Sequence, residues 1–195
     1  MGTINEYAQK LRNQRKELIQ ANRSLAQQAI TDSMTGLINH RGFQEELGRA
    51  FERRERLGTS LSLILMDIDY FKLFNDSYGH QAGDDLLATF GALLKRETRK
   101  HEPAARYGGE EFAVILEGAE MESAIQAADR LKKAIHQFQW EQRPVTASFG
   151  IATVHEGIDR EELIRRADIA LYESKRQGRD RVTHFSNIHS NCDAA

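Results

Sequence analysis

Two acidic pairs stand out in this sequence because carboxylates at this density can bind a divalent cation. Asp67 and Asp69 end the apolar segment 61–69, and Glu110 and Glu111 follow two glycines further along the chain. Side chains two residues apart on a strand point to one face, so we expect Asp67 and Asp69 to project together. Carboxylates at the end of a buried strand repel one another and lose hydration unless a cation compensates, and their oxygens suit Mg²⁺ or Mn²⁺. A strand that simply reaches solvent and ends in charge would give the same pattern.

The glycines before the two glutamates predict a tight hairpin turn. Gly108 and Gly109 would let the backbone approach a ligand closely and adopt positive φ angles without penalty. Two glutamates in such a turn are, taken alone, an ordinary solvated feature. If the second strand of the hairpin lies beside segment 61–69, however, Glu110 comes near Asp67. Carboxylates drawn from two neighbouring strand ends would form a much stronger metal site.

Basic side chains are placed where they could bind an anion. Lys72 follows the acidic strand end, and Lys175 and Arg179 lie four residues apart at the end of a predicted helix. At that spacing both side chains could contact one anion. Favourable positive charge at a helix C-terminus explains the same pair without any ligand.

Polar residues around a second turn could read a base. Asn75 and Asp84 flank the turn at 78–80, and an amide and a carboxylate together can hydrogen-bond a purine edge. Asn and Asp also cap helices and form turns, which is the alternative explanation. His80 is either structural or a minor ligand contact, and the remaining histidines show no metal-binding spacing.

The alternation of strands and helices predicts an α+β domain with a ferredoxin-like split βαβ core. We expect one helix from the N-cap Asn39 to Leu57, and later helices from Asp85, around 125–138 and over 161–176. Strands are expected over 61–69, on both sides of the glycine turn within 106–116, and over 145–154 and 181–185. The sheet should be antiparallel or mixed, with helices on one main face.

The first 30 residues differ in composition from the rest and form a separate segment. Ile4, Leu11, Leu18 and Leu25 recur every seven residues, which gives a helix over 1–30 an apolar stripe. We interpret this helix as a short dimerising coiled coil, and a solvated stub of a larger upstream region is the alternative. The folded domain then spans 31–186, and 187–195 form a loose tail.

Composition excludes several classes of protein. The chain has 195 residues and a net charge of −2, which excludes a strongly basic nucleic-acid binder. A single cysteine excludes a disulfide framework and a Cys-rich zinc site. Apolar runs are far shorter than the roughly 20 residues that a membrane span needs, and the polar N-terminus is not a signal peptide. We therefore expect a cytoplasmic protein with no nucleic-acid partner.

Four blocks of the chain resemble the GGDEF family of diguanylate cyclases. GGEEF at 108–112 is a variant of the family signature, and DIDYFKLFNDSYGHQAGD at 67–84 matches the second block. DSMTGLIN at 32–39 resembles the entry motif, and ADIALYESKRQGR at 167–179 resembles the closing helix. The resemblance implies a fold like the nucleotidyl cyclase and polymerase palm. It also implies Mg²⁺-dependent condensation of two GTP into cyclic di-GMP and two pyrophosphates across a symmetric homodimer, in bacterial second-messenger signalling.

The resemblance further implies a role for each candidate residue. Glu110 is the implied proton acceptor for the attacking 3′-hydroxyl, and Lys72 is the implied group that stabilises charge in the transition state. The implied metal ligands are Asp67, the carbonyl of Ile68, Glu110 and Glu111. The implied nucleotide-binding positions are Phe71, Asn75, His80, Asp84, Gly108, Gly109, Lys175 and Arg179.

The sequence departs from the family pattern at a few positions. Glu110 stands where the family name has Asp, and Met34 stands where the entry motif usually has Leu. The family's product-inhibition motif is Arg-x-x-Asp, and here Arg99 is followed by Glu102, whose carboxylate is one methylene further out. Inhibition at Arg99 and Glu102 is therefore left open. A non-catalytic module that binds GTP or cyclic di-GMP, and a pairing domain acting through 1–30, remain as alternatives, and an upstream regulatory protein or domain is expected to supply the signal.

Overall fold

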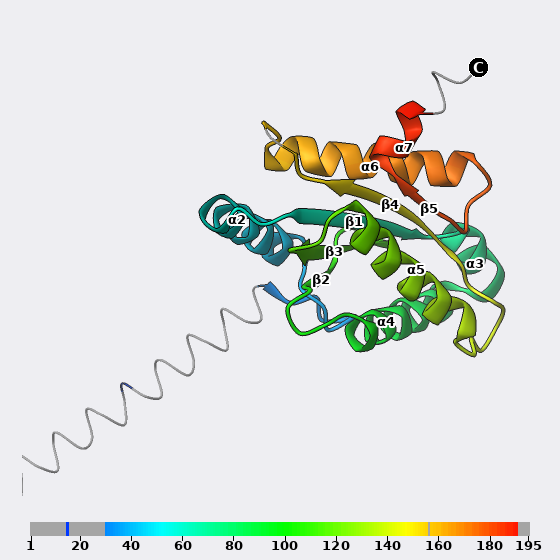
Figure 1. The fold of residues 1–195 in the computed structure, drawn as a ribbon. Helices are drawn as coiled ribbons and strands as arrows, with labels where there is room; N and C mark the ends of the chain where they lie inside the picture. Colours follow the sequence, from blue (N-terminus) through cyan, green and yellow to red (C-terminus); the bar gives the residue numbers. More distant parts are fainter. Residues whose placement is uncertain (1–14, 16–29, 156, 191–195) are drawn as a thin grey trace, which may run out of the picture.

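The protein, seen in a computed structural model, is described for residues 15, 30–155 and 157–190 (Figure 1). The elements of the domain follow one another along the chain as α2 (His40–Leu57), β1 (Leu61–Ile68), α3 (Phe71–Tyr78), α4 (His80–Glu97), β2 (Ala104–Arg106), β3 (Glu111–Glu117), α5 (Met121–Gln137), β4 (Ala147–Thr153), α6 (Arg160–Arg176), β5 (Val182–His184) and α7 (Phe185–Ser190). The heptad segment at 1–30 lies almost wholly outside the described residues.

The strands form one mixed sheet in the order β2-β3-β1-β4-β5. β3 lies between β1 and β2 and is antiparallel to both, which is the split βαβ arrangement that the sequence predicts. β4 pairs antiparallel with the other side of β1, and β5 is parallel to β4. β1 is therefore the central strand, and every one of its residues is buried.

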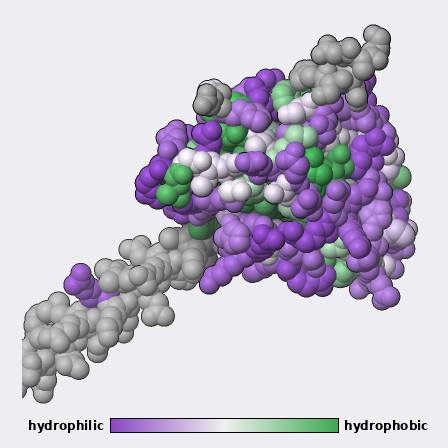
Figure 2. Space-filling model, in the orientation of Figure 1, coloured by the Kyte–Doolittle hydropathy of each residue, from purple (hydrophilic) through white to green (hydrophobic). Residues whose placement is uncertain are grey.

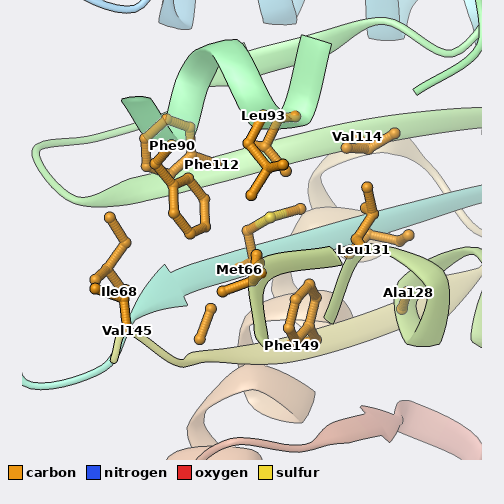
Figure 3. Packing of buried hydrophobic residues seen from close by; sticks show 14 of the residues in the cluster. Met66, Ile68, Phe90, Leu93, Phe112, Val114, Ala128, Leu131, Val145 and Phe149 are labelled. Carbon is orange, nitrogen blue, oxygen red and sulfur yellow. The ribbon is translucent and has the colours of Figure 1, made fainter. Parts of the chain in front are cut away.

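Helices cover both faces of the sheet, so the expectation of one main helical face is wrong. Even-numbered residues of β1 such as Met66 pack with α3, α4 and α5. Figure 3 shows Met66 near Leu93 of α4 and Leu131 of α5. Odd-numbered residues of β1 such as Leu63 pack with α2 and α6. The alternation follows from the two-residue period of a strand. It places Asp67 on the face of α2 and α6.

Local sequence explains where the helices begin and end. The side chain of Asn39 accepts a hydrogen bond from the backbone N–H of Gly42 at the start of α2, and Gly58 ends that helix with φ 64°. Asp159 caps α6 in the same way, by accepting from the N–H of Glu162. Figure 2 shows a mainly hydrophilic face with small hydrophobic patches. Among the helices of the described residues, none combines the length and the apolar composition that crossing a bilayer requires.

Two helices differ from the sequence expectation. α3 occupies 71–78 and α4 begins at His80, whereas we expected one helix from Asp85. The segment expected to be a loose tail contains part of α7, which ends at Ser190. Both differences concern short polar segments whose helical conformation depends on packing against the rest of the domain.

Candidate active site

The end of β1 brings the predicted carboxylates together. Asp67 pairs in register with Glu111 on β3, and the N–H of Ile68 donates to the carbonyl of Glu110 (3.3 Å). The second strand of the hairpin thus lies beside β1, as the sequence predicts. Asp67, Glu110 and Glu111 form an acidic cluster that we call the carboxylate cluster.

Lys175 is the positive charge that meets this cluster. Its Nζ lies 2.8 Å from Oδ2 of Asp67. The position of Lys175 depends on Gly150 of β4, because a Cβ at residue 150 would overlap the backbone of Ala167 and Leu171 in α6. The missing side chain lets α6 lie directly on the sheet, and Lys175 follows one turn after Leu171 at the level of Asp67.

Burial raises the pKa of all three carboxyl groups in the cluster, and the negative charge of a neighbouring carboxylate raises each of them further. Loss of hydration raises the pKa of Asp67 most, and the hydrogen bond from Lys175 opposes this. Burial also raises the pKa of Glu110 and of Glu111, and the negative charge of Asp67 raises both further. A cluster with this excess of negative charge favours a bound cation, because the cation stabilises the ionised carboxylates.

The glycine turn is held by a residue outside the cluster. Arg106 donates to the carbonyl of Gly109 from Nε (3.1 Å) and Nη2 (2.8 Å), and its Nη1 lies 3.3 Å from Oδ2 of Asp32. Hydrogen bonds from Thr35 and the charge of Arg106 overcome burial and lower the pKa of Asp32. Neither Arg106 nor Asp32 was predicted to hold this turn, although Asp32 lies within the entry motif and Arg106 lies two residues before the signature.

What matters at Gly108 and Gly109 is the absence of a side chain, rather than an unusual backbone angle. Neither Gly108 nor Gly109 has a positive φ, so that expectation is wrong. A Cβ on Gly108 would overlap Oε2 of Glu111, whereas the Cβ direction of Gly109 is open. The turn therefore leaves Glu111 room beside it and exposes the backbone at Gly109 to an approaching ligand.

Asp69 does not belong to the carboxylate cluster. Its Oδ1 accepts from the hydroxyl of Ser148 (2.7 Å), and its Oδ2 accepts from the hydroxyl of Thr146 (2.7 Å) and the N–H of Asp180 (3.1 Å). Three donors occupy this carboxylate, so it joins β1, β4 and the loop after α6. The sequence expectation that Asp69 shares the metal site is wrong.

The predicted anion-binding residues have separate positions. The guanidinium of Arg179 lies over the ring of Tyr70, 4.6 Å from its centroid, whereas Lys175 contacts Asp67. Burial raises the pKa of Asp67, and the positive charge of Arg179 partly opposes that rise. Lys72 is exposed in the first turn of α3.

The side chain of Phe71 is only 7% exposed and packs in the core, so a nucleotide contact at this position would involve its backbone. What remains for a ligand is its backbone N–H at the start of α3, where N–H groups have no partner within the helix.

The predicted base-reading residues meet where α3 packs on α4. Oδ1 of Asn75 is buried and has no hydrogen-bond partner in the part of the chain that the structure describes. It lies against Gly83, where a Cβ would overlap it, and Asp84 is the next residue. Buried polar atoms without a partner are uncommon, and a ligand that donates a hydrogen bond would satisfy this one. His80 and Asp84 are exposed beside it.

Arg99 and Glu102 lie apart from these residues, in the connection between α4 and β2. Glu102 is 8% exposed and accepts from the backbone N–H of Arg99 (2.9 Å), while Nε of Arg99 lies 3.7 Å from its other oxygen. Arg130 of α5 reaches the same carboxylate at 3.4 Å. Sequence reasoning missed Arg130, because its contact with Glu102 spans two elements.

Comparison with known proteins decides the family. The family model described as "Diguanylate cyclase, GGDEF domain" matches residues 29–181. The chain belongs to the GGDEF domain family. The diguanylate cyclase DgcP of Pseudomonas aeruginosa is 41% identical over 160 residues, which cover 80% of this chain and 24% of DgcP. A diguanylate cyclase of Vibrio cholerae is 37% identical over 85% of this chain and 52% of its own length. This GGDEF chain therefore spans between a quarter and about half of these relatives.

Solved GGDEF structures share the fold. The coiled coil and GGDEF domain of DgcB from Caulobacter crescentus, in complex with c-di-GMP, matches with a TM-score of 0.86 and 31% identity. It covers 93% of this chain and 98% of that one. The active GGEEF domain of a diguanylate cyclase from Vibrio cholerae matches with a TM-score of 0.73 and 34% identity over 76% of this chain and 97% of its own. The mixed five-stranded sheet with its helices is thus that of GGDEF domains.

Proposed function

We propose that this GGDEF domain is a diguanylate cyclase that condenses two GTP into cyclic di-GMP and two pyrophosphates. The observation that carries the proposal is the carboxylate cluster at the end of β1, with raised pKa values, next to Lys175. Similarity to relatives named diguanylate cyclases supports it. In each of two bond-forming steps, a 3′-oxygen bonds to an α-phosphorus, the bond from that phosphorus to the β-phosphate oxygen breaks, and pyrophosphate leaves.

Glu110 is the proposed acceptor of the 3′-hydroxyl proton. Burial and the charge of Asp67 raise its pKa, which makes its carboxylate a stronger base than an ordinary exposed glutamate. Glu110 also lies at the turn whose backbone is open at Gly109, so a nucleotide sugar can approach it. The proton therefore moves to a group positioned by β1 and β3 together.

The cluster fits Mg²⁺ or Mn²⁺ as the resident cation. Among the described residues, no group of three or more His, Cys, Asp or Glu side chains is arranged so that it could hold a metal ion by itself. Mg²⁺ does not need one, since it usually takes one or two carboxylates and completes its shell with water and substrate phosphates. Asp67, the carbonyl of Ile68 and Glu110 would hold it, with Glu111 beside a second ion. When bound, the ions would neutralise the triphosphate and polarise the reacting oxygens.

The remaining predicted residues would bind the nucleotide. A cation at Asp67 would replace the ammonium of Lys175, which is then free to meet phosphate together with Arg179. Lys72 and the free N–H groups at the start of α3 would bind phosphate from the other side. The unpartnered Oδ1 of Asn75 suits the amino group of guanine, and Asp84 suits a second guanine donor, with His80 alongside.

A dimer would complete the reaction, because one GTP must attack the other. Two half-sites facing each other replace an improbable encounter of two free nucleotides. The heptad stripe at 1–30 would set their orientation, and the match to a DgcB structure that includes a coiled coil supports this assignment. Regulation by a partner protein is also proposed, since a solved relative is diguanylate cyclase SiaD of Pseudomonas aeruginosa with its activator SiaC.

Inhibition by product is proposed at Arg99 and Glu102. Solved relatives include GGDEF domains in complex with c-di-GMP. In this chain Glu102 is already held by Arg99 and Arg130, so the longer carboxylate keeps the arginines grouped. Adding cyclic di-GMP to the turnover assay tests this assignment, and an Arg99→Ala variant should be insensitive to it.

The experiment for the main proposal is direct. Purified protein incubated with GTP and Mg²⁺ should yield cyclic di-GMP by chromatography, and Glu110→Gln should yield none while remaining folded by circular dichroism. Asp129→Asn, which removes an exposed carboxylate from α5, serves as the control and should retain activity. A folded, dimeric wild type that binds GTP without forming product would instead support the alternative of a non-catalytic binding module.

A further inference from the structure

The loop after α6 has an unusual backbone beside the candidate active site. In the described part of the chain, only three residues other than glycine have a positive φ, and they are Tyr70 (58°), Arg179 (64°) and Asp180 (49°). All three lie at one corner, since Arg179 stacks on Tyr70 and the N–H of Asp180 donates to Asp69. Such conformations persist only where the surroundings hold them, and they cluster at functional sites.

The side chain of Asp180 connects this corner to helix α5. Its Oδ1 lies 2.6 Å from Nε2 of His136 and 3.6 Å from Nζ of Lys132. Lys132 and His136 are four residues apart on α5 and therefore share one face of that helix. Helix α5, which lies on the opposite face of the sheet from α6, therefore holds the loop that follows α6. We call Lys132, His136 and Asp180 the α5 clamp.

Among the described residues, few other contacts fix the position of Arg179, whose carbonyl accepts from Nε of Arg181 (3.4 Å). The N–H of Arg179 donates to the carbonyl of Ser174 (3.0 Å), and its guanidinium stacks on Tyr70, which is 54% exposed. Two successive residues in the left-handed region determine the direction in which the side chain of Arg179 leaves the loop. Because Asp180 is the second of them, a change in its anchoring moves Arg179.

We propose that Lys132 and His136 are positioning residues that hold Arg179 in place for the phosphates of the nucleotide by anchoring Asp180. This inference rests on the assignment of Arg179 to phosphate in the proposed function. The two α5 side chains contact neither the carboxylate cluster nor Asn75 among the contacts of the described residues, so they act through the loop.

Binding measurements on the full chain test the clamp without requiring turnover. The probes are inorganic tripolyphosphate, which reports the phosphate site, and GMP, which reports the guanine site, both with Mg²⁺ in a calorimeter. The variant Lys132→Ala/His136→Ala should bind tripolyphosphate about tenfold more weakly, the size expected for one weakened charge-assisted hydrogen bond. The affinity of this variant for GMP should change by less than about twofold. Replacing His136 by Gln instead of Ala keeps a hydrogen-bond donor at that position and should restore most of the lost tripolyphosphate affinity.

A matched control lies one residue further along α5. Lys133→Ala/Gln137→Ala removes the same number of side chains at the same spacing from a neighbouring exposed face. It should bind both probes like the wild type. Equal losses in the clamp variant and in this control would overturn the proposal, because they would show a general effect of altering α5.

A double-mutant cycle separates positioning from a loss of stability. In an Arg179→Ala background, the clamp substitutions should cause no further loss of tripolyphosphate affinity, because the group they position is gone. The same tenfold loss in both backgrounds would overturn the inference, as would a parallel loss of GMP affinity. If Arg179→Ala leaves tripolyphosphate binding unchanged, the phosphate assignment itself fails. If the cycle holds but no cyclic di-GMP forms, the clamp stands and the proposed chemistry fails.

Discussion

At the scale of single residues, Asp67 and Asp69 are two residues apart and have different surroundings. Asp67 meets one ammonium and two other carboxylates, and its pKa is raised mainly by burial. Asp69 accepts three hydrogen bonds from donors on β4 and the α6 loop. The carboxylate of Asp67 is available for a ligand, whereas the carboxylate of Asp69 is occupied by hydrogen bonds within the fold.

This contrast predicts different effects of the two substitutions to alanine. Asp69→Ala leaves the partly buried N–H of Asp180 and two hydroxyls without their acceptor, which should lower the free energy of unfolding by about 2–4 kcal/mol. Asp67→Ala should change it by less than about 1 kcal/mol, since it removes repulsion as well as an ion pair. Urea unfolding of the metal-free proteins measures both. Similar losses would show that Asp67 is also structural.

A second residue-scale prediction concerns pH and Glu110. Because the folded state raises the pKa of this carboxyl, ionised Glu110 opposes folding above its folded pKa, and this penalty disappears below the unfolded value of 4.5. Glu110→Gln should therefore stabilise the metal-free protein at pH 7.5, by no more than about 1 kcal/mol after screening by solvent. The gain should shrink as the pH falls from the raised folded pKa toward 4.5, and it should be absent below 4.5. A destabilised variant at pH 7.5 would contradict the repulsion described for the cluster.

At the scale of elements, the contact of α6 with β4 determines where Lys175 lies. Gly150→Ala should push α6 away from the sheet, because the added methyl group meets helix backbone, and should lower the free energy of unfolding by about 1–3 kcal/mol. Product formation should fall further than the loss of folded protein explains, since Lys175 moves with the helix. Gly48→Ala is the matched control. Its Cβ meets only the end of the Arg160 side chain, so it should be neutral or stabilising.

The end of the sheet carries a pH-dependent contact of its own. His184 is 2% exposed, its Nδ1 accepts from the N–H of Ser186 in α7, and its Nε2 lies 3.1 Å from the hydroxyl of Thr153. Burial lowers its pKa, and nearby His155 lowers it further. The neutral ring that accepts from α7 therefore stabilises the fold fully above pH 6.5, and this stability is lost as the pH falls toward the folded pKa.

A variant isolates that contribution. The difference in unfolding free energy between the wild type and His184→Leu should fall between pH 7.5 and pH 5.5, with a slope of at most about 1.4 kcal/mol per pH unit for one proton. Taking the difference cancels the opposite trend of the carboxylate cluster. A difference that is independent of pH would show that the ring titrates in the same way in the folded and unfolded chains.

The sequence was informative where patterns are local and less so where packing decides. The strand 61–69, the hairpin and the proximity of Glu110 to Asp67 followed from apolar runs, glycines and topology. α3 was missed because Asn75, Asp76 and Ser77 read as turn formers, although Phe71 and Phe74 anchor the segment in the core. Helices on both faces, and the removal of Asp69 from the metal site, depend on contacts between distant elements such as Gly150 with α6.

At the scale of the whole molecule, the described residues of one chain contain one carboxylate cluster and one set of proposed nucleotide-binding positions. All of these lie at the same end of β1, next to α3 and the end of α6. The proposed reaction joins two nucleotides, so a single copy has no place for the attacking partner. Activity should therefore depend on how often two copies meet face to face, and the segment 1–30 is the part of the sequence suited to controlling that frequency.

Deleting residues 1–25 should lower activity and dimerisation together. The specific rate of product formation should fall at low protein concentration and recover as the concentration rises, with the midpoint shifted upward by about tenfold or more, because a tether that raises effective concentration has been removed. The domain itself should still fold, since the family match begins at residue 29 and the GGDEF domain of a relative has been solved by itself. Full-length Leu11→Glu/Leu18→Glu should behave like the deletion, whereas Asn13→Glu/Gln20→Glu, off the apolar stripe, should behave like the wild type. Analytical ultracentrifugation alongside the assay decides the matter, because full activity in a deletion protein that sediments as a monomer would disprove both the role of the segment and the two-copy reaction.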